Sequence, residues 1–247
     1  MEQNLDPILA GGEPIRRALV ISAHPDDPEF GFGASIARLT ASGVEVAYVI
    51  CTDGSQGGED PSVSDPDLTR RRYQEQREAA DALGVGEITF LGIPDGHVFA
   101  DLDLRRELVR AIRRHRPELV MTHAPMRSLS GMFGAGHPDH LAVGEATLAA
   151  VYPDSRNPRA FRELLDEGLA AHRVREVWFS GLPDPDHVLD VSQFVERKLE
   201  AISRHRSQFE KPNQDPEQPR KTILERMAKL GSEHGYAHAE GFRRLET

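Results

Sequence analysis

Residues 18–27 read Ala-Leu-Val-Ile-Ser-Ala-His-Pro-Asp-Asp, a run of small and branched apolar side chains that passes directly into imidazole and carboxylate groups. A short apolar run bounded by polar residues is typical of a strand that is covered on both faces. The polar residues that follow would then stand at the carboxyl end of that strand. This stretch therefore predicts a buried strand that delivers reactive side chains to one edge of a sheet.

Further apolar runs recur along the chain, and stretches with helical spacing separate them. The predicted strands are residues 18–23, 44–50, 88–91, 119–122 and 177–179. The predicted helices include residues 34–41, 71–83, 104–114 and 141–151. Strands that alternate with helices indicate an α/β fold, a doubly wound and mostly parallel sheet with helices on both faces.

The length and composition fit one globular domain. The chain has 247 residues, of which 38% are hydrophobic and 28% are charged, so it has enough apolar side chains for a sizeable core. We expect a single domain over residues 1–247, in which residues 188–247 form a strand and helices that pack on the core. Residues 54–67 are expected to be a mobile loop beside the functional edge, and residues 210–219 an irregular connection.

The charge and cysteine content argue against several classes of function. The formal charge of −10, from 40 acidic and 30 basic side chains, would repel nucleic acid and anionic membranes. We interpret residues 113–116, Arg-Arg-His-Arg, as the solvated last turn of a helix. The single cysteine, Cys51, excludes an internal disulfide and is expected to be a buried small hydrophobe. With no leader sequence and no apolar run of about 18 residues, the chain is expected to be cytoplasmic.

Polar, titratable and glycine residues follow the first four predicted strands. These segments are 24–27 (His-Pro-Asp-Asp), 52–58 (Thr-Asp-Gly-Ser-Gln-Gly-Gly), 94–97 (Pro-Asp-Gly-His) and His123, with 137–140 (His-Pro-Asp-His) one loop later. Because ligands of open α/β sheets bind at the carboxyl ends of the strands, we expect the functional site at this edge. His97 and His123 could line the pocket there, but surface or hydrogen-bonded roles are favoured for both.

Two of these segments supply the donors of a hydrolytic metal site. A catalytic zinc ion takes three protein ligands and keeps one position open for water. His24, Asp27 and His140 would provide a set of two histidines and one carboxylate. The same set also binds Fe²⁺ or Mn²⁺, so the sequence does not choose among these metals.

Asp26 and His137 would act beside this metal. A carboxylate next to a metal-bound water can take its proton as the water attacks a carbonyl carbon, which makes Asp26 the expected general base. His137 would donate to the developing oxyanion or to the leaving amine. Together these residues predict metal-assisted hydrolysis of an amide.

A structural interpretation of the same residues stays open. Asp26 or Asp27 could cap a helix that begins near Glu29. Asp139 could cap a helix that begins near Leu141, or orient a ligand imidazole.

Two other classes of function are also weighed. Gly31-Phe32-Gly33 with Asp53 loosely resembles a dinucleotide-binding fingerprint, but residues 24–30 separate these glycines from the strand and Ile36 replaces the third glycine. A nicotinamide-dependent oxidoreductase is therefore the weaker alternative, and the glycines are expected to permit close packing of a helix on the sheet. The other alternative is a non-catalytic module of the same fold that binds a metal or a sugar.

Motifs along nearly the whole chain resemble the LmbE-like, or PIG-L, family of zinc-dependent N-acetylglucosaminyl deacetylases. The matching segments are 23–27 with Gly33, 52–58, Arg72 with Glu75 ahead of 83–85, 94–96, 137–140, Lys198 with 205–208, and 239–242. The resemblance implies a Rossmann-like sheet and a zinc ion held by His24, Asp27 and His140. It further implies hydrolysis of the N-acetyl amide of an N-acetylglucosamine-type sugar conjugate, with Asp26 as general base and His137 as the second catalytic group.

The family pattern also implies substrate contacts and assembly. Arg72 would grip the sugar or phosphate part of the substrate, and Asp95 would bond sugar hydroxyls. Members that act in mycothiol biosynthesis have a tyrosine two residues before the first histidine of the second motif, where this chain has Ala135. Candidates for a replacement phenol are Tyr73, Tyr152 and Tyr236. The resemblance favours a homo-oligomer and leaves the sugar conjugate unidentified, while His205 is expected to be structural or at the surface.

Overall fold

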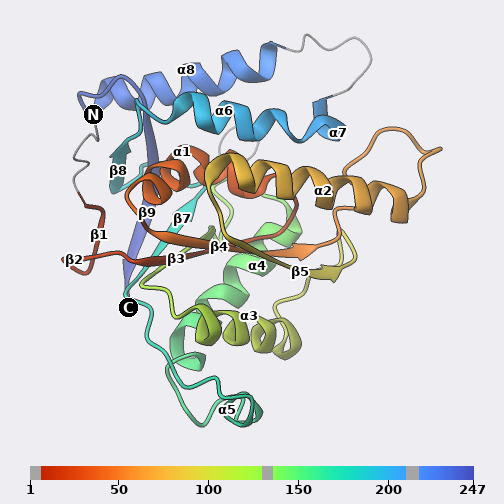
Figure 1. Ribbon diagram of the computed structural model, residues 1–247, viewed down its shortest axis with the longest axis vertical. Coiled ribbons are helices and arrows are strands. Elements are labelled where there is room, and N and C mark those ends of the chain that lie inside the picture. Colours follow the sequence, from red (N-terminus) through yellow and green to blue (C-terminus); the bar gives the residue numbers. More distant parts are fainter. Residues whose placement is uncertain (1–6, 130–135, 210–216) are drawn as a thin grey trace.

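The computed structural model describes residues 7–129, 136–209 and 217–247 and is built around one seven-stranded sheet (Figure 1). Its strand order is β5-β4-β3-β6-β7-β9-β8. The strands are β3 (Arg17–Ser22), β4 (Glu45–Thr52), β5 (Glu87–Ile93), β6 (Leu119–His123), β7 (Glu176–Ser180), β8 (His187–Asp190) and β9 (Ala239–Glu246). A separate antiparallel pair, β1 (Leu9–Ala10) and β2 (Glu13–Pro14), precedes them along the chain.

The five strands β3 to β7 pair in parallel, which confirms the predicted mostly parallel α/β sheet. The first of them, β3, is central because it pairs with β4 on one side and with β6 on the other. The order of strands along the chain therefore reverses at β3. In open α/β sheets such a switch point creates a crevice at the carboxyl ends of the strands, and His24 follows β3 there.

Helices cover both faces of the sheet, as predicted. They are α1 (Asp27–Ala41), α2 (Asp65–Leu83), α3 (Leu102–His115), α4 (Pro138–Ala149) continued by the π-helix η1 (Ala150–Asp154), α5 (Glu163–Asp166), α6 (Val195–Ser203), α7 (Arg206–Phe209) and α8 (Gln218–Glu233). Helices α1, α2 and α6 lie on one side of the sheet, and α3 and α4 lie on the other (Figure 1). In the described part of the chain, none of the helices has the length and apolar character that crossing a membrane requires.

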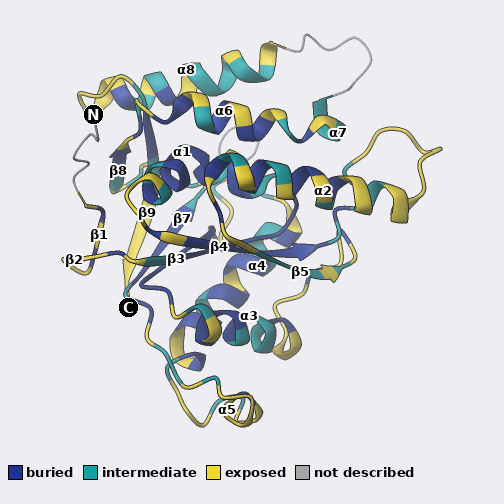
Figure 2. Cartoon of the chain, viewed as in Figure 1, coloured by how far each residue is buried: buried dark blue, intermediate teal, exposed yellow. Residues whose placement is uncertain are grey.

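Each face of the sheet has its own apolar core. Alternate side chains of β3 enter opposite cores: Val20 packs with residues of α1 and α2, and Ile21 packs with residues of α3 and α4. This alternation follows from the two-residue repeat of a strand. Buried residues accordingly concentrate on the strands and on the helix surfaces that face them (Figure 2). Cys51 is buried in the second core, as expected, and burial raises the pKa of its thiol.

The glycines of the weak dinucleotide fingerprint lie within α1 and serve packing. A Cβ on Gly31 would lie 3.2 Å from the Ser180 hydroxyl of β7, and one on Gly33 would lie 2.9 Å from the Lys198 side chain of α6. The expected close packing of a helix on the sheet therefore holds at Gly31. At Gly33 the close neighbour is a second helix.

Helices α1, α2 and α4 begin before their first apolar, periodic residues. The first turns of α1 and α4 contain Pro28 and Pro138, which are well suited to helix starts, and α2 is capped by the Ser64 side chain. These turns carry polar side chains, so the apolar spacing could not mark where each helix begins.

The C-terminal segment contains the predicted strand followed by helices, as β8 and then α6, α7 and α8, but it ends in a further strand that was not predicted. After α8 the chain returns to the sheet as β9, which is antiparallel to both β7 and β8. Its buried Phe242 stacks on Trp178 and on Phe32 with ring centroids 5.5 Å apart in each pair. The second half of β9 is exposed and contains Arg243 and Arg244, so the strand has no continuous apolar alternation that the sequence could reveal.

Arg113 is buried, which corrects the interpretation of residues 113–116 as a solvated helix end. Its guanidinium donates to the backbone carbonyls of Asp154, Ser155, Asn157, Ala160 and Phe161. The helical repeat places Arg113 on the same face of α3 as the buried Val109. Its neighbour Arg114 is exposed and lies 3.1 Å from Glu87 in a surface ion pair. The buried guanidinium of Arg113 therefore stands where an apolar side chain would be expected, because the carbonyls of the irregular backbone beside it need hydrogen-bond donors.

We expect Arg113→Met to lower the free energy of unfolding by about 2 kcal/mol, because several buried carbonyls would lose their donor. Arg114→Met is the matched control and should change that free energy by less than about 0.5 kcal/mol, as is usual for a surface site. Urea unfolding followed by circular dichroism measures both variants. Equal stability of the two would contradict the structural role of Arg113.

Candidate metal centre and active site

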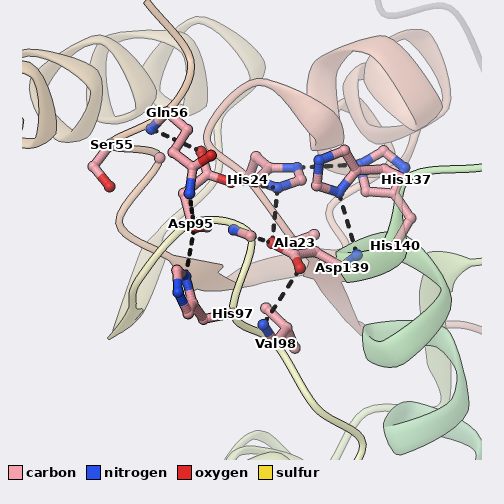
Figure 3. Close-up of polar contacts among 12 residues, drawn as sticks. Ala23, His24, Ser55, Gln56, Asp95, His97, Val98, His137, Asp139 and His140 are labelled. Carbon is pink, nitrogen blue, oxygen red and sulfur yellow. Dashed lines mark hydrogen bonds and ion pairs between the residues drawn. The ribbon is translucent and has the colours of Figure 1, made fainter.

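The three predicted metal ligands lie close together. Figure 3 shows two of them, His24 and His140, side by side. His24 follows β3, Asp27 is the first residue of α1, and His140 lies in the first turn of α4. His24 Nδ1 lies 3.2 Å from His140 Nε2 and 3.3 Å from Asp27 Oδ2, and His140 Nε2 lies 3.1 Å from Asp27 Oδ1. Each side chain thus offers one donor atom within 4.8 Å of the other two.

Within the described ranges a second set of donors shares one of these residues. It consists of His24, Asp95 and His137. His24 Nε2 faces this set and lies 3.1 Å from Asp95 Oδ1, whereas Nδ1 faces the first set. The two imidazole nitrogens of His24 therefore point to different partners.

Asp139 orients His24 and does not cap α4. Its Oδ2 lies 3.3 Å from His24 Nε2, and its two oxygens accept from the backbone N–H groups of Gly96 and Val98 at 2.8 Å and 3.3 Å. The cap of α4 is His137, whose Nδ1 accepts from the Asp139 N–H at 3.2 Å. Of the two roles considered for Asp139, contact with the imidazole is the one that the geometry shows.

Neither Asp26 nor Asp27 is a side-chain cap of α1. Asp26 occupies the N-cap position but makes no capping hydrogen bond with its side chain. The Asp27 carboxylate turns back and accepts from the His24 N–H at 2.7 Å. The Asp27 carboxylate is therefore directed to the site, whereas the Asp26 carboxylate accepts from Arg72.

The charges at the site fit a bound cation. Burial alone would lower the pKa of His24, but its hydrogen bonds to the carboxylates of Asp139, Asp27 and Asp95 raise that pKa to about 12. The pKa of Asp27 is well below its usual range, because His140 and His123 outweigh the effect of its burial. The site therefore holds several ionised carboxylates around buried imidazoles, and such a set of N and O donors suits a divalent metal ion.

His123 belongs to the site, and its predicted hydrogen-bonded role is confirmed. Its Nε2 accepts from the Ala23 N–H at 3.0 Å and lies 3.3 Å from Asp27 Oδ2. Its ring stacks on that of His140 with centroids 4.0 Å apart. The side chain thus packs against two of the predicted ligands. The only signal in the sequence was its position at the end of a predicted strand.

Asp26 has a backbone conformation that is unusual for a side-chain-bearing residue, with φ of 101°. Conformations of this kind cost about 1–3 kcal/mol and concentrate at functional sites. Burial raises the pKa of the Asp26 carboxyl to about 6, although Arg72, whose Nη2 lies 3.2 Å from Oδ2, opposes that shift. Asp26, the residue before Asp27, therefore has a carboxyl group whose pKa lies close to pH 7.

Arg72 is buried and binds the protein's own backbone. Its guanidinium donates to the carbonyls of Pro25 at 2.6 Å and Gly54 at 2.8 Å, as well as to Asp26. A Cβ on Gly57 would lie 1.9 Å from Arg72 Nη1, so glycine is required where this loop crosses the guanidinium. The predicted contact between Arg72 and the substrate stays a prediction.

Asp95 lies beside His24, and its predicted contact with sugar hydroxyls also stays a prediction. Its carboxylate accepts from the Gln56 N–H at 3.2 Å, in addition to the contact with His24 (Figure 3). Its side chain is only 6% exposed. His97 is exposed, and its ring contacts the Asp95 carbonyl at 3.0 Å.

A cavity of about 770 Å³ opens beside the candidate ligands. Asp27, His137 and His140 form part of its wall, and Phe30 and Met126 add apolar surface. Ala135 lies outside the described residues. Of the three candidate tyrosines, Tyr73 stacks on Phe90 at 3.9 Å between centroids, Tyr152 is 63% exposed and Tyr236 is 40% exposed. None of these three lines the cavity in the described part of the chain.

Residues 19–151, more than half of the chain, match the family described as GlcNAc-PI de-N-acetylase, or PIG-L. The chain belongs to this family. It is 34% identical over 230 residues to a diacetylchitobiose deacetylase of Thermococcus kodakarensis, a match that covers 93% of this chain and 83% of that protein. It is 32% identical over 200 residues to a probable N-acetyl-alpha-D-glucosaminyl L-malate deacetylase 2 of Bacillus cereus, covering 79% of this chain and 84% of the relative.

The structure of this PIG-L family member also matches a solved relative. An N,N'-diacetylchitobiose deacetylase from Pyrococcus horikoshii, complexed with its inhibitor MPG, superposes with a TM-score of 0.86 at 31% identity. The match covers 94% of this chain and 84% of that chain. The family resemblance, expected from the motifs at residues 23–27 and 137–140, is therefore confirmed.

If His24, Asp27 and His140 hold the ion, His140→Ala should remove most of its binding, because only two protein ligands would remain. Chelator-treated protein titrated with Zn²⁺ in a calorimeter gives the affinity and the stoichiometry. His97→Ala is the matched control at the same edge of the sheet and should bind one ion as the unaltered protein does. Undiminished zinc affinity in His140→Ala would contradict this ligand set.

Proposed function

We propose that the protein hydrolyses the N-acetyl amide of an N-acetylglucosamine-type sugar conjugate and releases acetate and a free amine. The observation that carries this proposal is the convergence of His24, Asp27 and His140 next to a large cavity, with the adjacent Asp26 close enough for its carboxyl to be influenced by the charges of Asp27 and His24. Relatives named as deacetylases of such sugars match most of the chain, which supports the same reaction class.

Zn²⁺ is the ion that we propose for the site. His24 Nδ1, an Asp27 oxygen and His140 Nε2 would hold it and leave a position open. When bound there, the ion would supply Lewis acidity to the amide carbonyl and to the attacking water. Asp139 and Asp95 fix the ring of His24 from its other nitrogen, an arrangement that commonly orients ligand imidazoles.

Asp26 is the proposed general base. Its carboxylate would take the proton of the water that attacks the carbonyl carbon. A base works best when its pKa lies near the working pH, and burial holds the pKa of Asp26 at about 6. Its side chain makes no capping bond to α1, and Arg72 donates to Oδ2, which leaves Oδ1 to take this proton.

His137 is the proposed donor to the oxyanion. Its Nδ1 accepts the Asp139 N–H, so a neutral ring carries its proton on Nε2. Burial and the neighbouring His24 and His140 lower the pKa of His137, which favours that neutral form. Because His137 lines the cavity, its N–H can donate to the charge that develops on the carbonyl oxygen.

We expect Asp26→Asn to lower kcat by about 10²–10⁴-fold, the usual contribution of a general base, while zinc binding is retained. Acetate release from N,N'-diacetylchitobiose and from a small panel of N-acetylglucosaminides measures the rate. The exposed Asp81 of α2 provides the control Asp81→Asn, which should leave kcat unchanged. If the zinc-loaded protein releases no acetate from any of these sugars, the proposed function is wrong.

A further inference from the structure

A chain of buried polar side chains runs from the C-terminal helices to the backbone of Asp26. His205, which precedes α7, places Nε2 3.0 Å from Glu29 Oε2. Both oxygens of Glu29 accept from Gln76 Nε2, at 3.0 Å and 3.1 Å. Gln76 Oε1 in turn accepts from the Asp26 N–H at 2.8 Å. These hydrogen bonds thus connect residues that are far apart in the sequence to the backbone of Asp26.

Burial and chemistry fix the direction of these hydrogen bonds. The residues His205, Glu29 and Gln76 are at most 1% exposed, so water does not compete for their polar atoms. Both oxygens of the Glu29 carboxylate accept from Gln76 Nε2, so Gln76 turns its amide nitrogen toward Glu29. Its amide oxygen is then held toward the Asp26 N–H.

This series of buried side chains provides a hydrogen-bond acceptor for the Asp26 N–H. Asp26 is the N-cap residue of α1, so no carbonyl of that helix is available to its N–H. Its left-handed φ also has to be maintained by surrounding contacts. Gln76 reaches this peptide group from α2, whose neighbouring turn carries Arg72 to the Asp26 carboxylate.

We propose that Gln76 is a positioning residue for the hydrolytic reaction: supported by Glu29 and His205, it holds the Asp26 backbone in the conformation that aims the carboxylate. This inference rests on the proposed role of Asp26. It also gives a function to His205, which the sequence motif alone left without one. The residue acts through Asp26 and does not itself need to touch the substrate.

The preceding residue of α2 offers a matched control. Glu75 is 1% exposed and accepts from the N–H and the hydroxyl of Ser207 at 2.9 Å and 2.6 Å. Glu75 therefore links α7 to α2 directly, whereas Gln76 is connected to His205 through Glu29. None of the described hydrogen bonds of Glu75 reaches residues 24–27. Glu75→Gln perturbs the same helical interface without acting on Asp26.

A double-mutant cycle tests the proposal. Gln76→Met, which keeps the length of the side chain and removes its polar atoms, should lower kcat roughly tenfold or more in the wild-type background, with KM nearly unchanged. In the Asp26→Asn background it should lower kcat by less than about twofold, because the base that it positions is already lost. Glu75→Gln should leave kcat within about twofold in both backgrounds. If Gln76→Met lowers kcat by the same factor in both backgrounds, the role is structural and the proposal is overturned.

Amide hydrogen exchange at Asp26, followed by NMR, supplies a readout that does not depend on activity. Exchange should accelerate in Gln76→Met and stay unchanged in Glu75→Gln, and unchanged exchange in Gln76→Met would also overturn the proposal. Should Gln76→Met fail to fold, Gln76→Asn replaces it, because the shorter side chain keeps the amide but cannot reach both Glu29 and the Asp26 N–H. Absence of acetate release by the wild-type protein would instead count against the proposed function. The exchange measurement would still show whether Gln76 holds the Asp26 backbone.

Discussion

Three carboxylates surround the imidazole of His24, and this concentration of negative charge is the constraint on which the site depends. Asp27 lies at one ring nitrogen, and Asp95 and Asp139 lie at the other. Burial in the crevice makes such a group of charges costly unless a cation neutralises it. These carboxylates raise the pKa of His24, and a divalent ion between His24, Asp27 and His140 would neutralise their charge. The same charges explain why the site needs so many hydrogen bonds from backbone N–H groups.

The fold supplies this arrangement from three directions. Central strand β3 delivers His24 to the switch point, and α1 and α4 present Asp27 and His140 from their first turns. A helix N-terminus favours a carboxylate, which suits Asp27, and Asp26 precedes it in a strained conformation. The C-terminal segment completes the support, because the buried Lys198 and Glu240 pair at 2.6 Å and Glu240 accepts from the backbone of α1. Residues distant from the ligands therefore hold the helix that carries them.

Much of this site could be predicted from the sequence because its signals are local. Each parallel strand is a short apolar run, and the residues after it necessarily reach the same edge of the sheet. The pairing of residues 23–27 with 137–140 then predicted the candidate ligands and indicated the family. The helix starts were less visible, because their first turns contain proline and polar residues in place of apolar spacing.

Other features depend on tertiary contacts that no local pattern reports. Strand β9 is hidden by its exposed arginines, and Arg113 follows the helical spacing of buried residues but carries a charge that suggests solvent. Gln76 sits in a polar helix where nothing in the sequence distinguishes it from its neighbours. Its contact with Asp26 becomes apparent only when α2 is packed beside α1.

We propose that His24, Asp27 and His140 share one cation. Anomalous diffraction at the zinc edge, from crystals of the zinc-loaded protein, would locate it. We expect a single strong peak about 2.0–2.2 Å from His24 Nδ1, an Asp27 carboxylate oxygen and His140 Nε2. A peak between His24, Asp95 and His137, or no peak at either set, would contradict it.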